Sequence, residues 1–454
     1  MNLRQSLMSK PILLNGVLLF VFGGIWLIGC FQTRNTMQSQ GVNVALAWNQ
    51  FILQAEVNTE GYRGPVAART YGYVGLAAFE AARPGFAGNY NSMADRYKGL
   101  NMPTLPDSRH FDPALSLNAC YALIIEKFFL SAPGNIKQNG KQLEEDWVKK
   151  LSRGVDSLTY NTSIGYGRRI AEAVFNWSAT DSLGHTANHH NYDRNYIPPV
   201  GDGLWKTSPY FPMPPLLPYW GEVRPFVIQK EAYIAKQLPP YTKQANQLYY
   251  IQAMELISLS KPLSSENQWI AEFWNDDRPG LTFSPAGHWL AIANQVIEKE
   301  NPPLEKALET YMKVGFGLAD AMIACFNAKY IYNLERPETF IQKYIDPDWR
   351  PFSPSPPFPS YPSGHSMMGA AVAEILKDLY GDPYTLRDRS HEGLEDFMVK
   401  PRKFSSFDEM ARENAISRVY LGVHWRFDCE EGLRLGKLIG EEVNGIKVEK
   451  ELIE

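Results

Sequence analysis

The sequence predicts an all-α fold made of two packed subdomains. Apolar residues recur at helical spacing along most of the chain, and no segment shows a strong alternation of apolar and polar residues. With 454 residues, the chain is longer than one hydrophobic core usually supports. Its 44% apolar and 21% charged residues are typical of a globular protein, and a net charge of -4 argues against nucleic acid as a partner.

The first thirty residues have the pattern of a secretion signal. Arg4 and Lys10 precede an apolar run over residues 11–28, and Gly29-Cys30 closes it. This resembles the cleavage signal of bacterial lipoproteins, in which the cysteine is lipidated. We therefore expect residues 1–30 to be a lipoprotein signal peptide, with the lipid on Cys30 and the protein in the bacterial cell envelope as a periplasmic or outer-membrane lipoprotein. An uncleaved membrane-spanning anchor is the alternative.

Residues 42–180 are expected to form an N-terminal helical bundle. Pro65 suits the first turn of the second helix, Pro84-Gly85 ends it, and residues 86–108 have the composition of a long loop. The predicted helices cover residues 42–57, 65–79, 113–130, 143–155 and 166–178.

Residues 181–240 combine many prolines with aromatic residues, which excludes a long helix or a central strand. A connecting segment of this length is usually functional or wraps a neighbouring element. It contains His185, His189 and His190, but no carboxylate or cysteine stands at a supporting spacing. We therefore interpret these histidines as part of a polar loop rather than as a metal site.

Residues 241–454 are expected to form a second, C-terminal helical bundle. Asn275-Asp276-Asp277 is interpreted as a turn rather than a cation site, and six prolines between residues 351 and 362 indicate an extended connector. Away from the signal segment, Cys120, Cys325 and Cys429 do not make a disulfide framework, so we expect buried free thiols, with a single bridge as the alternative. The predicted helices cover residues 241–259, 267–274, 287–298, 304–334, 407–421 and 430–443, and another begins near Ser363.

The start of that helix is suited to an oxyanion. In Pro362-Ser363-Gly364-His365, the exposed N–H groups of the first turn and the helix dipole favour negative charge. Gly364 allows close approach of the backbone, and Ser363 adds a hydroxyl. The same sequence could also be a plain helix cap.

Two cations lie upstream of it. Lys329 and Arg336 are seven residues apart, which predicts that they share one helical face, and Pro337 is expected to end that helix. Arginine grips oxyanions through a planar fork, and lysine supplies a point charge. Without other motifs, a solvated basic face would explain both residues.

Arg418, His424 and Asp428 form the third motif. His424 and Asp428 are four residues apart and can meet on a helix. A carboxylate on one imidazole nitrogen fixes the tautomer and leaves the other nitrogen as a nucleophile or a metal ligand. Taken alone, the pair could also be a surface ion pair.

The three motifs, in this order and spacing, resemble the signature shared by vanadium haloperoxidases and type-2 phosphatidic acid phosphatases. Residues 358–365 and 417–428 are most similar to the fungal chloroperoxidase branch, and residues 205–226 and 271–274 to large bacterial haloperoxidase-like proteins. The resemblance covers the chain from about residue 42 onward. It implies two four-helix bundles, with the active site in the C-terminal one.

The resemblance also implies vanadate as cofactor and a role for each signature residue. His424 would be the vanadium ligand, Asp428 would orient it, and His365 would be the acid–base group for hydrogen peroxide, which oxidises a halide. Phe358 matches the chloroperoxidase branch, whereas Phe326 stands where such proteins generally carry Trp. The residues expected to bind the oxygens of vanadate or phosphate are Lys329, Arg336, Ser363, Gly364 and Arg418.

The same residues would also serve an acid phosphatase, which needs no vanadate. His424 would then attack the phosphorus of a phosphate ester and form a phosphohistidine, and His365 would protonate the leaving alkoxide. The size of the chain, its proline-rich aromatic segment and the lack of several apolar spans favour the peroxidase. A third hypothesis is a surface lipoprotein that only binds phosphate or a glycan, but binding alone needs no acid–base histidine pair.

Overall fold

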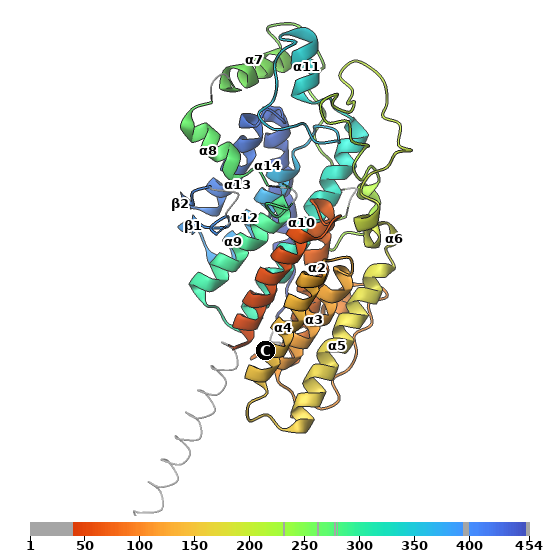
Figure 1. The fold of residues 1–454 in the computed structure, drawn as a ribbon, viewed down its shortest axis with the longest axis vertical. Helices are drawn as coiled ribbons and strands as arrows, with labels where there is room; N and C mark the ends of the chain where they lie inside the picture. The colour runs from red at the N-terminus through yellow and green to blue at the C-terminus, as the bar shows by residue number, and fades with distance from the viewer. Residues whose placement is uncertain are drawn as a thin grey trace, which may run out of the picture.

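The computed structural model describes residues 40–229, 232–260, 263–276, 278, 280–393 and 399–450, and these are predominantly helical (Figure 1). The all-α prediction is confirmed. One small hairpin, formed by β1 (Leu386–Asp388) and β2 (Arg402–Phe404), was not predicted, because three-residue strands are too short to show alternation. The predicted signal peptide and Cys30 lie outside the described residues. Within the described part, no helix has the length and apolar character needed to cross a membrane.

The N-terminal helices pack around α2, in which every residue is buried. Pro65 occupies its first position, as predicted, and a short 3-10 turn over Arg83–Gly85 follows its end. Asp112 caps α3 by accepting a hydrogen bond from the Leu115 N–H at 2.9 Å. The elements are a helix over residues 40–58, α2 (Pro65–Ala82), α3 (Pro113–Phe128), α4 (Gly134–Leu151) and α5 (Ser157–Ala179).

The C-terminal helices are arranged around α10, which runs through the middle of the molecule (Figure 1). α12 packs against α10, α13 and α14. The first helix of this half begins at Leu248, later than predicted. The elements are α7 (Leu248–Ser260), α8 (Ser265–Phe273), α9 (Pro285–Glu300), α10 (Leu304–Tyr332), α11 (Pro337–Tyr344), α12 (Gly364–Tyr380), α13 (Phe407–Tyr420) and α14 (Arg426–Asn444).

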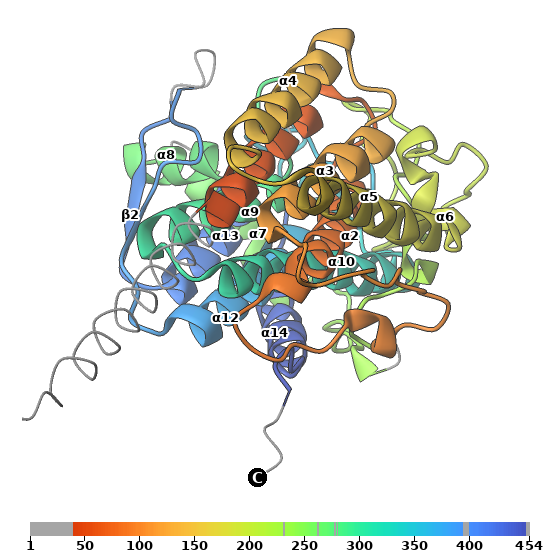
Figure 2. The ribbon, with the colours of Figure 1, turned by 90° about the horizontal axis from the view of Figure 1, so that it is seen from below.

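The two groups of helices meet where α2 crosses α10 (Figure 2). A Cβ atom on Gly75 would lie 2.8 Å from the Cα of Met312, and one on Gly315 would lie 2.7 Å from the carbonyl oxygen of Tyr71. A side chain at either glycine would push the helices apart, so these glycines allow one hydrophobic core to extend through both groups. The division at residues 180 and 240 into three units stays a prediction.

The proline-rich connecting segment wraps α10, as expected for a long loop in a compact protein. The buried carboxylate of Asp320 accepts hydrogen bonds from the N–H groups of Phe226, Val227 and Ile228 at 2.7, 2.7 and 3.0 Å. Among the described residues, the three histidines of the segment belong to no group that could hold a metal. Cys120, Cys325 and Cys429 are buried free thiols, as predicted.

Candidate active site

The three sequence motifs converge on one cavity of about 70 Å³ in the C-terminal half. Its lining comes from α10, from the start of α12, from the end of α13 and from the loop that precedes α14. The predicted residues that line it are Phe326, Lys329, Phe358, Gly364, His365, Arg418 and His424.

Lys329 lines this cavity from α10, whereas Arg336 precedes α11 and contacts the cavity residue His424, so the predicted shared helical face is wrong. α10 ends at Tyr332, and Asn333 takes the left-handed conformation that terminates helices. Pro337 does not end a helix but begins α11, with Arg336 as the residue just before it. The sharp turn between the two helices still directs both side chains to the same place.

Both cations are buried and donate to neutral carbonyl groups. Lys329 Nζ lies 3.0, 2.7 and 2.6 Å from the carbonyl oxygens of Pro359, Ser360 and Pro362. Arg336 donates to the carbonyl oxygens of Phe358 at 3.0 Å and Val423 at 2.7 Å.

In the described part of the chain, neither cation forms an ion pair with a carboxylate. Burial lowers the pKa of Lys329 and lowers that of Arg336 to about 10. Because buried cations without a counter-charge are costly, the cavity favours an anion.

His424 is held as a neutral imidazole with a defined tautomer. Its Nδ1 lies 2.9 Å from Oδ2 of Asp428, while Arg336 Nη1 lies 3.1 Å from its Nε2. A guanidinium can only donate, so Nε2 carries the lone pair and Nδ1 the proton. Burial, together with Arg336, holds the pKa of His424 well below its ordinary value.

The predicted pairing of His424 with Asp428 is present, but not along a helix. His424 precedes α14, and Asp428 is the third residue of α14. The carboxylate of Asp428 also accepts a hydrogen bond from the Trp425 N–H at 3.2 Å. Ser360, which sequence reasoning missed, donates its hydroxyl proton to the same carboxylate oxygen. Its position within a proline-rich connector gave no signal of this role.

His365 and Arg418 form a second hydrogen-bonded pair in the cavity. Arg418 Nη1 donates to His365 Nε2 at 2.9 Å, and its Nη2 donates to the carbonyl oxygen of Trp274 at 2.6 Å. Burial and then Arg418 hold the pKa of His365 well below its ordinary value. His365 is therefore a neutral imidazole that can accept a proton.

Three helices begin at the cavity. Pro65, Pro285 and Gly364 are the first residues of α2, α9 and α12, and all three line it. The positive ends of three helix dipoles therefore favour an anion there. Ser363 does not line the cavity, and its hydroxyl accepts a hydrogen bond from the Ser366 N–H at 3.4 Å as the cap of α12. The sequence pointed to only one of these three helix starts, because the other two come from distant segments.

A larger cleft of about 640 Å³ adjoins the cavity and shares Phe358, His365 and Arg418 with it. Arg63, from the loop before α2, lines both spaces and was not predicted. The ring of Phe358 lies 5.3 Å from that of Phe326, and the Arg336 guanidinium lies 4.9 Å above it. The inner space thus combines fixed positive charge with an aromatic wall.

Comparisons with known proteins agree with this geometry. Residues 309–450 match a family model described as the second helical-bundle domain of VCPO. The chain is 34% identical to the vanadium chloroperoxidase of Curvularia inaequalis, over 16% of this chain and 18% of that protein. It is 38% identical to the vanadium-dependent bromoperoxidase of Ascophyllum nodosum, over 19% of this chain and 17% of that protein. The matches thus span less than a fifth of these curated relatives.

Solved structures extend the similarity over most of the chain. A bacterial vanadium-dependent iodoperoxidase superposes with a TM-score of 0.79 and 27% identity, covering 90% of this chain and 98% of that one. The chain belongs to the vanadium haloperoxidase superfamily. A bacterial vanadium-dependent chloroperoxidase shares the fold, with a TM-score of 0.64 and 15% identity over 86% of this chain and 93% of that one.

Because the chain belongs to this superfamily, the grouping of its signature residues supports a common site for them. Lys329, His365, Arg418 and His424 come from distant segments and line one cavity, and Arg336 and Asp428 both contact His424. Their individual chemical roles stay predictions.

Proposed function

We propose that the protein is a vanadium-dependent haloperoxidase that oxidises a halide with hydrogen peroxide. The observation that carries the proposal is His424 Nε2, an acceptor nitrogen hydrogen-bonded by Arg336, on a residue that lines the same cavity as Lys329 and Arg418. A tetrahedral oxyanion with an open coordination position, such as vanadate, fits both features. When bound, vanadate supplies the chemistry that makes peroxide reactive toward halide.

The chain's own residues would hold this anion in place. Lys329, Arg336 and Arg418 are suited to its oxygens, and the start of α12 adds N–H groups from Gly364 onward. Asp428 keeps the proton on His424 Nδ1, so that Nε2 stays available as the ligand.

His365 would accept a proton from incoming hydrogen peroxide. Burial and Arg418 lower its pKa, so it is neutral at neutral pH, and it can take a proton on Nε2 once Arg418 turns from it to the bound anion. An acid phosphatase would instead need a protonated histidine to release the alkoxide.

Iodide is the halide that we propose as substrate. The iodoperoxidase structure is similar over nearly the full length of both chains. Phe326 and Phe358 offer an apolar, polarizable wall for a large and weakly hydrated anion. Hydrogen peroxide and iodide would reach the cavity through the outer cleft.

The test pairs two assays on one preparation. Purified protein loaded with orthovanadate is given hydrogen peroxide with iodide or bromide, and triiodide or the bromination of a dye is followed. The vanadate-free protein is given a phosphomonoester, and phosphate release is followed. We expect halide oxidation that depends on added vanadate. Phosphate release without any halide oxidation would establish the phosphatase instead.

We also propose that the protein is a lipoprotein of the bacterial cell envelope, held at the membrane by a lipid on Cys30. The support is the sequence pattern of residues 1–30. Mass spectrometry of the N-terminal peptide tests this proposal. A mature chain that begins with a diacylated Cys30 is expected, and an intact, unlipidated Met1 would overturn it.

A further inference from the structure

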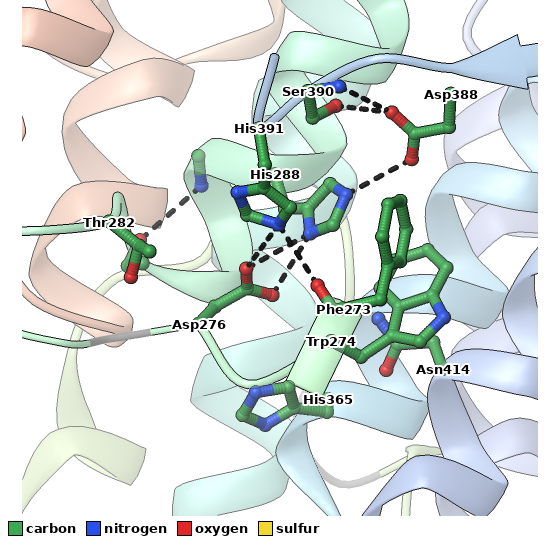
Figure 3. Close-up of polar contacts among 12 residues, drawn as sticks. Phe273, Trp274, Asp276, Thr282, His288, His365, Asp388, Ser390, His391 and Asn414 are labelled. Carbon is green, nitrogen blue, oxygen red and sulfur yellow. Dashed lines mark hydrogen bonds and ion pairs between the residues drawn. The ribbon is translucent and has the colours of Figure 1, made fainter. Parts of the chain in front are cut away.

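A second buried polar cluster lies next to the cavity and takes no direct part in the proposed chemistry (Figure 3). His288, on α9, stands between two carboxylates. Its Nδ1 lies 3.0 Å from Asp276 and its Nε2 lies 3.0 Å from Asp388. His391, whose ring lies beside that of His288, approaches the same carboxylate of Asp276 at 3.6 Å. These four residues come from three separate segments of the chain, and all are buried.

The geometry fixes the charge of His288. A neutral imidazole has one N–H group, whereas two carboxylates at hydrogen-bond distance from both ring nitrogens require two donors. His288 is therefore an imidazolium. Consistently, although burial alone would lower it, Asp276 and Asp388 raise the pKa of His288 to about 10. Asp388 is itself anchored by hydrogen bonds from Ser390 and Gln295.

This cluster holds the end of α8 and the residues that follow it in place. His391 Nε2 lies 2.9 Å from the carbonyl oxygen of Phe273. The Trp274 ring stacks on the His288 ring with centroids 4.5 Å apart, and Asp276 is bound to His288. The carbonyl oxygen of Trp274, between these three anchors, accepts from Arg418, which in turn donates to His365. Figure 3 shows His365 on the Asp276 side of the cluster.

We propose that His288, held as an imidazolium between Asp276 and Asp388, is a positioning residue for Arg418. Together with His391, it fixes the Trp274 carbonyl and thereby the direction of the Arg418 guanidinium. Arg418 lines the cavity of about 70 Å³ described above, which we call the oxyanion cavity. The inference rests on the proposed function only in that the cavity binds an oxyanion. A divalent metal between Asp276, His288 and His391 is the competing explanation, since their ligand atoms lie within 4.8 Å of one another.

The first test measures vanadate affinity by calorimetric titration rather than turnover. His288→Asn removes the charge and the stacking ring, and it should weaken vanadate binding by about 10- to 100-fold, the range for residues that orient a ligand-binding group. Ile124→Ala, which opens a space in the buried face of α3, is the control that loses stability without touching Arg418. It should bind vanadate as the wild type does. Unchanged affinity in His288→Asn would overturn the proposal.

A second variant separates positioning from a general loss of packing. In His288→Asn, Asp276 and Asp388 face each other without their cation. Adding Asp388→Asn removes this repulsion and should restore part of the vanadate affinity. An affinity that falls further in the double variant would show that packing alone is involved, which also overturns the proposal.

Spectroscopy of the histidines distinguishes the imidazolium from a metal site. With ¹⁵N-labelled histidine, the wild type at pH 8 should show one imidazolium with both nitrogens protonated, and His288→Asn should lack it. A stoichiometric transition metal found by elemental analysis, with a chelator changing the His288 resonances, would overturn the proposal.

The titrations also keep this inference apart from the proposed function. Wild type that binds vanadate but oxidises no halide would contradict the function and leave the positioning role intact.

Discussion

Two buried polar clusters lie side by side in this protein, and they balance charge in opposite ways. In the oxyanion cavity, Lys329 and Arg336 donate to neutral carbonyl groups. In the neighbouring cluster, the His288 imidazolium has a carboxylate on each ring nitrogen. The cations of the cavity thus have no carboxylate ion pair among the described residues, whereas the cation of the cluster is compensated, with one carboxylate in excess. We infer that cations without an ion pair mark the site that binds a ligand, and a compensated cation marks the part that holds it in shape.

The largest effect is expected from His424→Ala. It removes the only predicted vanadium ligand, so vanadate-dependent halide oxidation should fall to the rate of free vanadate in buffer. The exposed His190→Ala serves as a control and should keep full activity. Initial rates of triiodide formation at saturating peroxide measure both variants. Substantial activity in His424→Ala would mean that the cavity is not where oxidation occurs.

Arg336→Met tests the charge of Arg336 directly. Loss of one fixed donor to the anion should lower activity by about 10²- to 10³-fold. Stability without vanadate should change little, because relief from a buried cation that has no direct ion pair among the described residues offsets the lost hydrogen bonds to Phe358 and Val423.

Arg402→Met is the matched change at a compensated cation, since Arg402 is paired with Glu413 at 2.6 Å. It should lose stability and keep activity. Thermal melts with and without vanadate provide the measurement, and only the wild type and Arg402→Met should be stabilised by the anion. A large drop in melting temperature for Arg336→Met alone would break the comparison.

The sequence predicted most of the helices and seven of the residues that line the cavity, but not how the chain delivers them. The spacing of Lys329 and Arg336 fits one helix face, yet Asn333 ends α10 between them, and a left-handed asparagine has no unique sequence signature. The His424–Asp428 contact was predicted from a helical spacing and is made instead at a helix start. A correct contact can therefore follow from an incorrect local geometry.

The compensated cluster escaped prediction for a different reason. Asp276 was interpreted as part of a turn, His288 is a single polar residue in an apolar run, and His391 lies in the charged stretch 387–392. Asp276 and Asp388, the two carboxylates that contact His288, lie 12 and 100 residues from it in the sequence. Only the packing of α9 against β1 brings them together, and no local pattern records that arrangement.

Titration of His288 in the compensated cluster should make the free energy of unfolding depend on pH. The pKa of His288 is raised from 6.5 to about 10, so its contribution is complete below pH 6.5 and is lost as pH rises toward 10. The upper bound is about 5 kcal/mol. The pKa of Asp388 is lowered from 3.8 to about 2, despite burial, by His288, so its contribution is lost only as pH falls through 2. Urea unfolding between pH 6 and 10 measures the slope, which should flatten in His288→Asn. An equal slope in both proteins would contradict the ion pair.

The buried Glu56 should also make the stability depend on pH, with a smaller effect than His288. It accepts hydrogen bonds from the Tyr71 hydroxyl and from the Ser284 N–H at 2.6 Å. Burial raises its pKa from 4.5 to about 7, so stability should fall as pH rises from 4.5 to 7, by at most about 3 kcal/mol. Glu56→Gln should reduce this slope without changing the one above pH 7, and the raised pKa values of Asp320 and Glu335 account for part of the slope that stays. Unfolding curves below and above pH 7 would show whether Glu56 and His288 titrate independently.

The smallest effect is expected from Phe326→Trp, which changes the apolar wall of the cavity and none of its charges. Phe326 is almost fully buried against Phe358, so the larger indole must take up part of the space beside the anion. A narrower space disfavours the larger halide, and the indole N–H adds a donor for a smaller, more strongly hydrated one. We therefore expect kcat/KM for bromide relative to iodide to rise a few-fold, a change of about 1 kcal/mol, while vanadate affinity stays unchanged. Steady-state rates with each halide measure the ratio. An altered vanadate affinity would show that the aromatic wall and the charged donors are coupled rather than separate parts of the site.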